Sequence, residues 1–376
     1  MTTVTASPTI QAALRRFPLV GRPRPACPAL TDRVAEVAEI AATTAAGRED
    51  GGMAEAAHAL NLAALIASDC GLPDLARQWC WQHIDVYRQL GTLTTLQAGY
   101  LLEPVLNLAR LQIRANNGQP ALHLLQTMYE AVTTGIDLTI DGHTLLLTNL
   151  AGTRDELGQL RRWAWLQHLN EGIRILALAG RWDDAVHHAT TLNGIGLHLM
   201  EGRQAAIIAH LLHDDTETAH TLLHASSITE PWEQQVSACL TAMCPPPGGA
   251  DARMTAMTDR FLAAVPTPGY VLYRARLGLT VITLLADHDE STAQHLLNHL
   301  ITEVLDTPDG YAAREVLGHR TSLRIKEPRH RALTQVVDAA GLGARTMPEA
   351  IHETLTEAVQ TARRVLTHSV EPAGYH

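Results

Sequence analysis

The stretch "LALAGRWDDAVHHATTL", residues 176–192, predicts two helices joined by a tight turn. Its apolar run ends at Gly180, and a second run begins at Trp182 with two acidic residues behind it. Glycine tolerates the left-handed conformation that ends many helices, and acidic residues suit the positive N-terminus of the next helix. Five residues after the glycine comes Ala185, whose small side chain allows the second helix to approach the first closely. The segment therefore predicts a helical hairpin with an alanine at the crossing point.

The same arrangement recurs at four other places in the chain. In each, an apolar run stops at a break residue and an alanine follows five residues later. The pairs are Gly71 and Ala76, Asn116 and Ala121, Asp214 and Ala219, and His288 and Ala293. The interval from Ala185 to Ala219 is the shortest, and the longer intervals between the other alanines leave room for longer units or insertions. Helical hairpins repeated along a chain predict an all-α array.

The segment "LALAGRWDDAVHHA" resembles a tetratricopeptide repeat. Gly180, Trp182 and Ala185 match the turn glycine, the aromatic residue and the second-helix alanine of that family, and the interval from Ala185 to Ala219 equals its period. "IASDCGLPDLARQWC" keeps the glycine and the alanine, while the first-helix Trp and Gly and the closing Pro of the consensus are mostly absent. The resemblance extends over positions 50–300 in five places. It implies a tetratricopeptide-like α-solenoid of antiparallel helix pairs.

Composition agrees with a helical core and argues against some partners. The chain has 376 residues, 46% of them hydrophobic and only two of them Phe, so the core must be built from Leu, Ala, Val and Ile. A net charge of −10 argues against nonspecific binding of nucleic acid. There is no apolar run of eighteen residues and no signal-peptide pattern, and five scattered cysteines suit reduced thiols. We expect a cytoplasmic protein without a membrane segment.

Proline and glycine clusters suggest boundaries along the chain. Residues 1–30 carry five prolines and are expected to form a flexible arm ahead of a helical array over residues 31–244. "CPPPGGADARM", residues 244–254, cannot be helical through its centre, so residues 245–252 are predicted to be a linker or loop. Residues 253–376 are expected to form further helical repeats and capping helices. "TTGIDLTIDGHTLLLTNLAGT", residues 133–153, alternates in polarity around Asp141–Gly142 and predicts a small β-hairpin near residues 135–150.

The twenty histidines raise the question of a metal site. His220 and His224, and likewise His295 and His299, are four residues apart and would share a helix face. Zinc needs three or four ligands, and the HExxH motif is absent. No phosphate-binding glycine loop and no GxSxG motif is present either. We therefore expect neither a metal nor a cofactor.

Polar residues on the predicted first helices are candidates for binding. The resemblance implies that the first helix of each pair lines the concave face of the solenoid. Counting back from the alanines places four residues on that face, and two more flank them at one-turn spacing. The candidates are Asn61, Asn107, Arg110, Arg114, Asn170 and Arg174. Arg and Asn side chains can hold a peptide backbone or a carboxylate, although ordinary solvated positions would show the same residue types.

Three functions remain open from the sequence. The array and the lack of a compact catalytic motif favour a protein that binds a peptide or protein segment in its groove. "LNLAALIASDCGLPDLARQWCWQH" and "ITEPWEQQVSACLTAMC" resemble accessory proteins of ribosomal-peptide natural-product pathways of the lanthipeptide kind. This resemblance implies a peptide-modifying enzyme, for example a metal-free thioether-forming cyclase, with a base and a proton donor drawn from His187, His188, Tyr270 and Tyr273. A regulator that senses a small ligand is the third possibility, and without a basic recognition helix it would not contact DNA itself.

Overall fold

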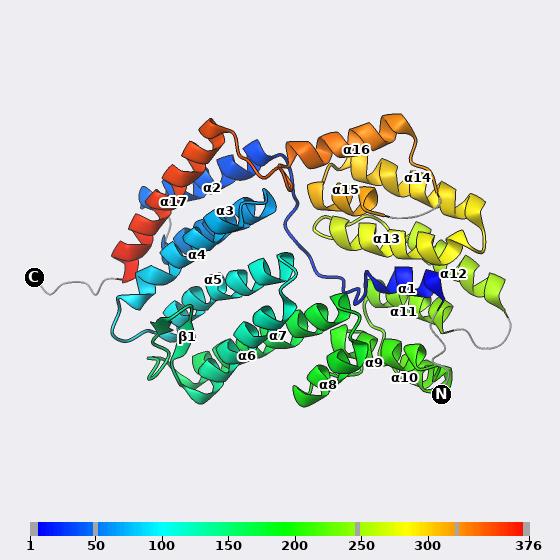
Figure 1. Ribbon diagram of the computed structural model, residues 1–376, viewed down its shortest axis with the longest axis horizontal. Helices are drawn as coiled ribbons and strands as arrows, with labels where there is room; N and C mark the ends of the chain where they lie inside the picture. The colour runs from blue at the N-terminus through cyan, green and yellow to red at the C-terminus, as the bar shows by residue number, and fades with distance from the viewer. Residues whose placement is uncertain (1–6, 48–51, 245–248, 320–322, 371–376) are drawn as a thin grey trace, which may run out of the picture. The chain divides into compact units, whose positions relative to one another are not determined.

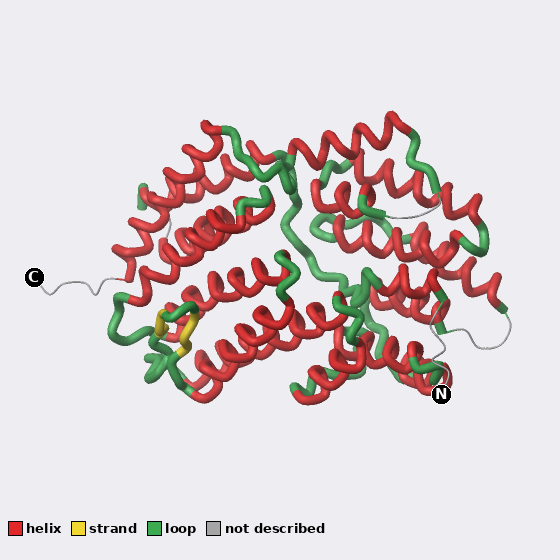
Figure 2. Tube along the Cα trace, viewed as in Figure 1, coloured by secondary structure: helices red, strands yellow, loops and turns green. Residues whose placement is uncertain are grey.

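The computed structural model describes residues 7–47, 52–244, 249–319 and 323–370. These residues form seventeen helices and a single two-stranded antiparallel sheet (Figures 1 and 2). The prediction of an all-α fold with a small β-hairpin is therefore confirmed. Among the described residues, no helix combines the length and the apolar character that a membrane crossing requires.

The chain divides into two compact units. Unit 1 contains Met1–Pro28 and Gly172–Ala340, and unit 2 contains Ala29–Glu171 and Gly341–His376. Residues 245–248 of the expected linker lie outside the described residues, and the break at residues 171 and 172 falls inside a continuous helix, where no Pro or Gly cluster marks it.

Unit 2 is built from helices that pack against their neighbours in sequence. Helix α3 packs on α4, α4 on α5 and α5 on α6 (Figure 1). The last helix, α17, packs on α2 and α3 through an apolar stripe that includes Leu355, Ala362 and Leu366. The elements are α2 (Leu30–Ala45), α3 (Gly52–Asp69), α4 (Pro73–Arg88), α5 (Thr95–Arg114), α6 (Gly118–Thr134), β1 (Leu138–Ile140), β2 (His143–Leu145), α7 (Arg154–Leu178, in this unit as far as Glu171) and α17 (Glu349–Val370).

The predicted breaks are helix ends, and most of them are left-handed. Four of the five have a positive φ, which is +76° at Gly71, +62° at Asn116, +70° at Gly180 and +61° at Asp214. In each case the next residue donates its N–H to the carbonyl oxygen five residues back, at 2.9 Å, which is the Schellman arrangement. The fifth break differs, because its helix ends in right-handed conformation at Asp287.

The anchoring alanines all occupy the same place after the turn. Each is at most 1% exposed, and each donates its N–H to the N-cap carbonyl four residues back, at 3.0–3.2 Å. These residues are Ala76, Ala121, Ala185, Ala219 and Ala293. The small side chain is therefore buried in the first turn of the second helix.

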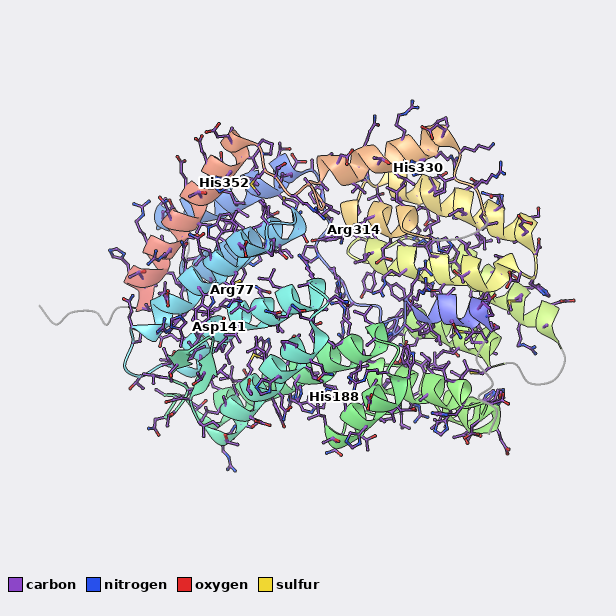
Figure 3. All side chains as sticks on the ribbon, viewed as in Figure 1. Arg77, Asp141, His188, Arg314, His330 and His352 are labelled. Atoms are coloured by element: carbon purple, nitrogen blue, oxygen red, sulfur yellow. The ribbon has the colours of Figure 1, made fainter. Side chains whose placement is uncertain are left out.

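The β-hairpin lies between α6 and α7 and explains the long interval before Ala185. Asp141 and Gly142 form its turn with φ of +52° and +79°, the left-handed pair that a type I′ turn needs. Arg77 of α4 forms an ion pair with Asp141 (Figure 3), and the rings of Trp81 and His143 have centroids 4.8 Å apart. The hairpin is thus attached to α4.

Unit 1 is organised around α13, which is buried along most of its length. Helix α13 packs on α1, α11, α12, α14 and α15. The elements of this unit are α1 (Pro8–Leu14), α8 (Trp182–Thr191), α9 (Glu201–Leu212), α10 (Thr216–His224), α11 (Pro231–Met243), α12 (Ala250–Ala263), α13 (Val271–Ala286), α14 (Glu290–Asp306), α15 (Gly310–Leu317) and α16 (Glu327–Ala339).

Residues 7–28, which fall within the arm expected over residues 1–30, are packed in unit 1. This segment begins with α1 and continues as an irregular chain that buries Phe17, Leu19 and Cys27. Leu19 exchanges two main-chain hydrogen bonds with the side chain of Gln204, at 2.8 and 2.7 Å. The prolines prevent a continuous helix here, but they do not prevent the segment from packing on other elements of unit 1, such as α13.

Candidate functional site

A chain of hydrogen bonds between polar side chains crosses α3, α5 and α7 in unit 2. Asn61 Nδ2 donates to Glu103 Oε2 at 2.5 Å, and Asn107 Nδ2 donates to Asn61 Oδ1 at 3.1 Å. Arg110 donates through Nη1 to Asn107 Oδ1 at 3.5 Å and through Nε to Glu171 Oε1 at 2.8 Å. We call Asn61, Glu103, Asn107, Arg110 and Glu171 the polar ladder.

The spacing of residues on α5 explains why the ladder forms there. Glu103, Asn107, Arg110 and Arg114 are four, three and four residues apart, so they lie on one face of the helix. The other faces of α5 carry buried apolar residues, including Leu101, Leu102, Val105 and Leu108. Burial of these apolar faces fixes the rotation of the helix and presents its polar face toward α3 and α7.

Arg114 extends the polar face toward the end of α3. Its Nη1 donates to Ser68 Oγ, and its Nη2 lies 3.0 Å from Asp69 Oδ1. Asp69 is buried and also pairs with Arg33 at 2.6 Å. The position of the exposed Arg114 is therefore tied to a buried ion pair.

Titratable groups gather at the Glu103 end of the ladder. Burial raises the pKa of Glu103, and His58, Asn61 and Arg110 oppose that shift. Burial also raises the pKa of Tyr87, as do Tyr100 and Glu103, and the Tyr87 hydroxyl has no hydrogen-bond partner within the described part of the chain. Protonated groups are therefore favoured at this end of the site.

Four of the six residues predicted for the groove are joined in this network. They are Asn61, Asn107, Arg110 and Arg114. Asn170 is half-buried beside Glu171, and within the described residues no hydrogen bond of its side chain is recorded. Arg174 is exposed and belongs to unit 1.

The acidic partners Glu103, Glu171 and Asp69 are not predicted by the repeat spacing. The spacing between Glu103 and Asn107 on α5 indicates a shared face, so Glu103 could have been found from the sequence. Glu171 and Asp69 lie on other helices, and no pattern within one helix identifies the residue opposite it.

The residues proposed for catalysis do not form one cluster. His187 is exposed on α8, while His188 is half-buried, and its imidazole packs against the backbone of Gly172 (Figure 3 labels His188). Tyr270 and Tyr273 are near the start of α13, with ring centroids 6.5 Å apart at 87°. Both tyrosines line a cavity of about 380 Å³ in unit 1, and neither histidine belongs to its lining.

Among the described residues, no group of three or more His, Cys, Asp or Glu side chains is placed to hold a metal ion. Comparison of the chain with family models, with curated proteins and with solved structures gave no match.

Proposed function

We propose that unit 2 binds an extended segment of a peptide or protein along the polar ladder of α3, α5 and α7. The observation that carries this proposal is the unbroken hydrogen-bond path from Glu103 through Asn61, Asn107 and Arg110 to Glu171. Such a path holds side-chain donors and acceptors in place before a ligand arrives, which lowers the entropy cost of binding. The tetratricopeptide resemblance supports the same face, because it implies that first helices line the groove.

The chemistry of the ladder suits a peptide main chain. The side chains of Arg110 and Arg114 are 44% and 43% exposed, so part of each guanidinium is open to solvent. A guanidinium carries five N–H donors, more than the recorded bonds use. Because Glu171 and Asp69 already balance the charges, we expect these donors to hold main-chain carbonyls or one carboxylate rather than a strongly acidic segment.

A peptide selected from a random display library against the full chain provides the probe for a test by isothermal titration calorimetry. The double variant Asn107→Ala/Arg110→Ala is expected to weaken binding of the selected peptide at least ten-fold. Arg161→Ala is the matched control, because Arg161 is exposed on α7 outside the ladder and its loss is expected to leave affinity unchanged. Equal affinity of the wild type and the double variant would contradict the proposal, as would a library that yields no binder.

A peptide-modifying enzyme, such as a thioether-forming cyclase, is the second candidate. It is favoured by the raised pKa of Glu103 and Tyr87 next to the ladder, because a protonated carboxyl or phenol can donate a proton. In such a cyclase a cysteine sulfur of the substrate bonds to the β-carbon of a dehydroalanine, the thiol proton passes to a base, and an acid protonates the α-carbon. Incubation with a dehydrated, cysteine-containing precursor, followed by thiol alkylation, tests the reaction, with Glu103→Gln as the comparison. Undiminished free thiol in the substrate would exclude it.

A further inference from the structure

The cavity of about 380 Å³ in unit 1 is a second candidate site, and it is separate from the polar ladder. It lies between α11, α13 and α14 and the loop that precedes α13. Its volume is within the range of sites that hold small molecules. Three aromatic residues, Trp232, Tyr270 and Tyr273, contribute to its wall.

The aromatic side chains are held in place by the surrounding structure. Trp232 packs against the backbone of Gly21, where an added Cβ would lie 2.4 Å from Trp232 Cγ. The Tyr273 hydroxyl lies 3.1 Å from the Trp232 carbonyl oxygen and 3.3 Å from Gln235 Oε1, so it can donate to either. The ring of Tyr270 meets that of Tyr273 edge to face. The wall is therefore formed before any ligand binds.

The charges that line the cavity leave an excess of negative charge. Arg274 donates to both oxygens of Glu303, at 2.7 and 2.6 Å, and its guanidinium lies 4.4 Å from the centroid of the Phe261 ring. The opposite charges of Arg274 and Glu303 therefore cancel each other. Glu230 also lines the cavity and is exposed. Its main-chain N–H donates to Glu233 Oε2 at 3.0 Å, and within the described part of the chain the structure shows no ion pair for its own carboxylate. The wall of the cavity thus carries one carboxylate that forms no ion pair with the described residues.

We propose that this cavity binds an organic ammonium ion, that is, a primary amine carried by an apolar or aromatic body. The faces of aromatic rings carry partial negative charge and attract cations, and a nearby carboxylate adds to that attraction. An anion would be repelled by the Glu230 carboxylate. The aliphatic side chains Val271, Leu300 and Val304 suit the apolar body of the ligand. A free amine, the N-terminus of a peptide and a lysine side chain share this chemistry.

Titration calorimetry on the full chain with phenethylammonium and 2-phenylethanol tests the role of the charge, because the two probes have nearly the same shape. The ammonium ion is expected to bind at least five-fold more tightly than the alcohol. Glu230→Gln is expected to remove that preference, whereas Glu217→Gln, at an exposed position on α10, should retain it. Gly21→Ala displaces Trp232 and should weaken binding of both probes, and Glu230→Gln carries the test alone if Gly21→Ala does not fold.

Three further probes distinguish the sources of the amine. Phenylalanine amide presents an N-terminal amine, Nα-acetyl-lysine amide presents a lysine side chain, and N-acetyl-phenylalanine amide presents neither. Tighter binding of at least one amine than of the acetylated control supports the proposal and identifies the source. Equal binding of the charged and neutral probes would overturn it in favour of a simple apolar pocket, and absence of binding by every amine would overturn it outright. Neither result bears on the polar ladder, which lies in unit 2.

Discussion

Asp69 of α3 and Arg33 of α2 form an ion pair of 2.6 Å in which the side chains are only 1% and 8% exposed. The same aspartate pairs with Arg114 on the polar face, and its carbonyl oxygen accepts the N–H of Gly343 at 2.7 Å. One residue therefore connects two helices of the N-terminal part of unit 2, the candidate binding face and the segment that leads to α17. A buried charge in such a position is costly to leave without its partner.

Replacement of Asp69 by Asn is expected to destabilise unit 2 strongly. It would remove the buried carboxylate that pairs with Arg33, and the loss for a broken buried pair is about 3–5 kcal/mol. Urea unfolding followed by tryptophan fluorescence would show the midpoint at lower denaturant. Asp85→Asn is the matched control, because Asp85 pairs with Arg88 at a more exposed position. If both variants unfolded at the same urea concentration, the structural importance assigned to Asp69 would be wrong.

The alanine at the crossing of a helical hairpin should not accept a larger side chain. Ala185 is 0% exposed, so Ala185→Leu would force the helices apart, and overpacking costs about 1–3 kcal/mol. Thr190→Leu places the same side chain at an exposed position on α8 and should change stability by less than about 0.5 kcal/mol. Thermal unfolding of the two variants compares them directly. A tolerated leucine at position 185 would mean that the helix pair does not depend on close approach there.

The helical hairpins could be predicted because their determinants are local. The left-handed residue, the cap and the alanine lie within two turns of helix of one another, as they do from Gly180 to Ala185. The hairpin turn at Asp141–Gly142 is equally local, since its two positive φ angles are a preference of those residue types. Sequence spacing also placed Asn107, Arg110 and Arg114 on one helix face.

Packing between segments that are distant in the sequence could not be predicted from these local patterns. The apolar stripe of α17 predicts that the helix is covered on one side, but not that it packs on α2 and α3, which come from the opposite end of the sequence. The burial of Phe17 and Leu19 depends on groups such as Gln204 that are distant in sequence. The cavity in unit 1 likewise needs three separate segments to meet, and no pattern within one segment reveals the other two.

The buried His83 should make unit 2 sensitive to acid. Both of its ring nitrogens are without a hydrogen-bond partner in the described structure, and burial lowers the pKa of His83 to about 3. Between that value and the ordinary pKa near 6.5 the unfolded chain binds a proton that the folded chain does not, so stability falls as the pH falls. A pKa difference of this size costs about 2 kcal/mol of stability on going from neutral pH to pH 5.

His83→Phe is expected to remove this part of the acid sensitivity. The phenylalanine ring keeps the size and the contact with Tyr87, whose ring centroid lies 5.8 Å away. The measurement is the difference in urea midpoint between neutral pH and pH 5, which should be smaller in the variant than in the wild type. Comparing each protein with itself cancels any change in packing. The same substitution at the exposed His123 should leave the difference as it is, and an unchanged difference for His83→Phe would show that His83 does not titrate as proposed.

The five cysteines are expected to be unreactive toward thiol reagents while the chain is folded. They are reduced and at most 1% exposed, and burial raises the pKa of Cys80, Cys239 and Cys244 to about 12. Because the thiolate is the reactive form, a disulfide reagent at mildly alkaline pH should modify less than one thiol per chain in minutes, and all five in concentrated guanidinium chloride. Thr190→Cys supplies an exposed thiol that should react at once. Rapid modification of thiols in the folded wild type would refute the burial of these residues. If the folded chain does not react, a thiol assay for peptide cyclisation reports on the thiols of the substrate alone.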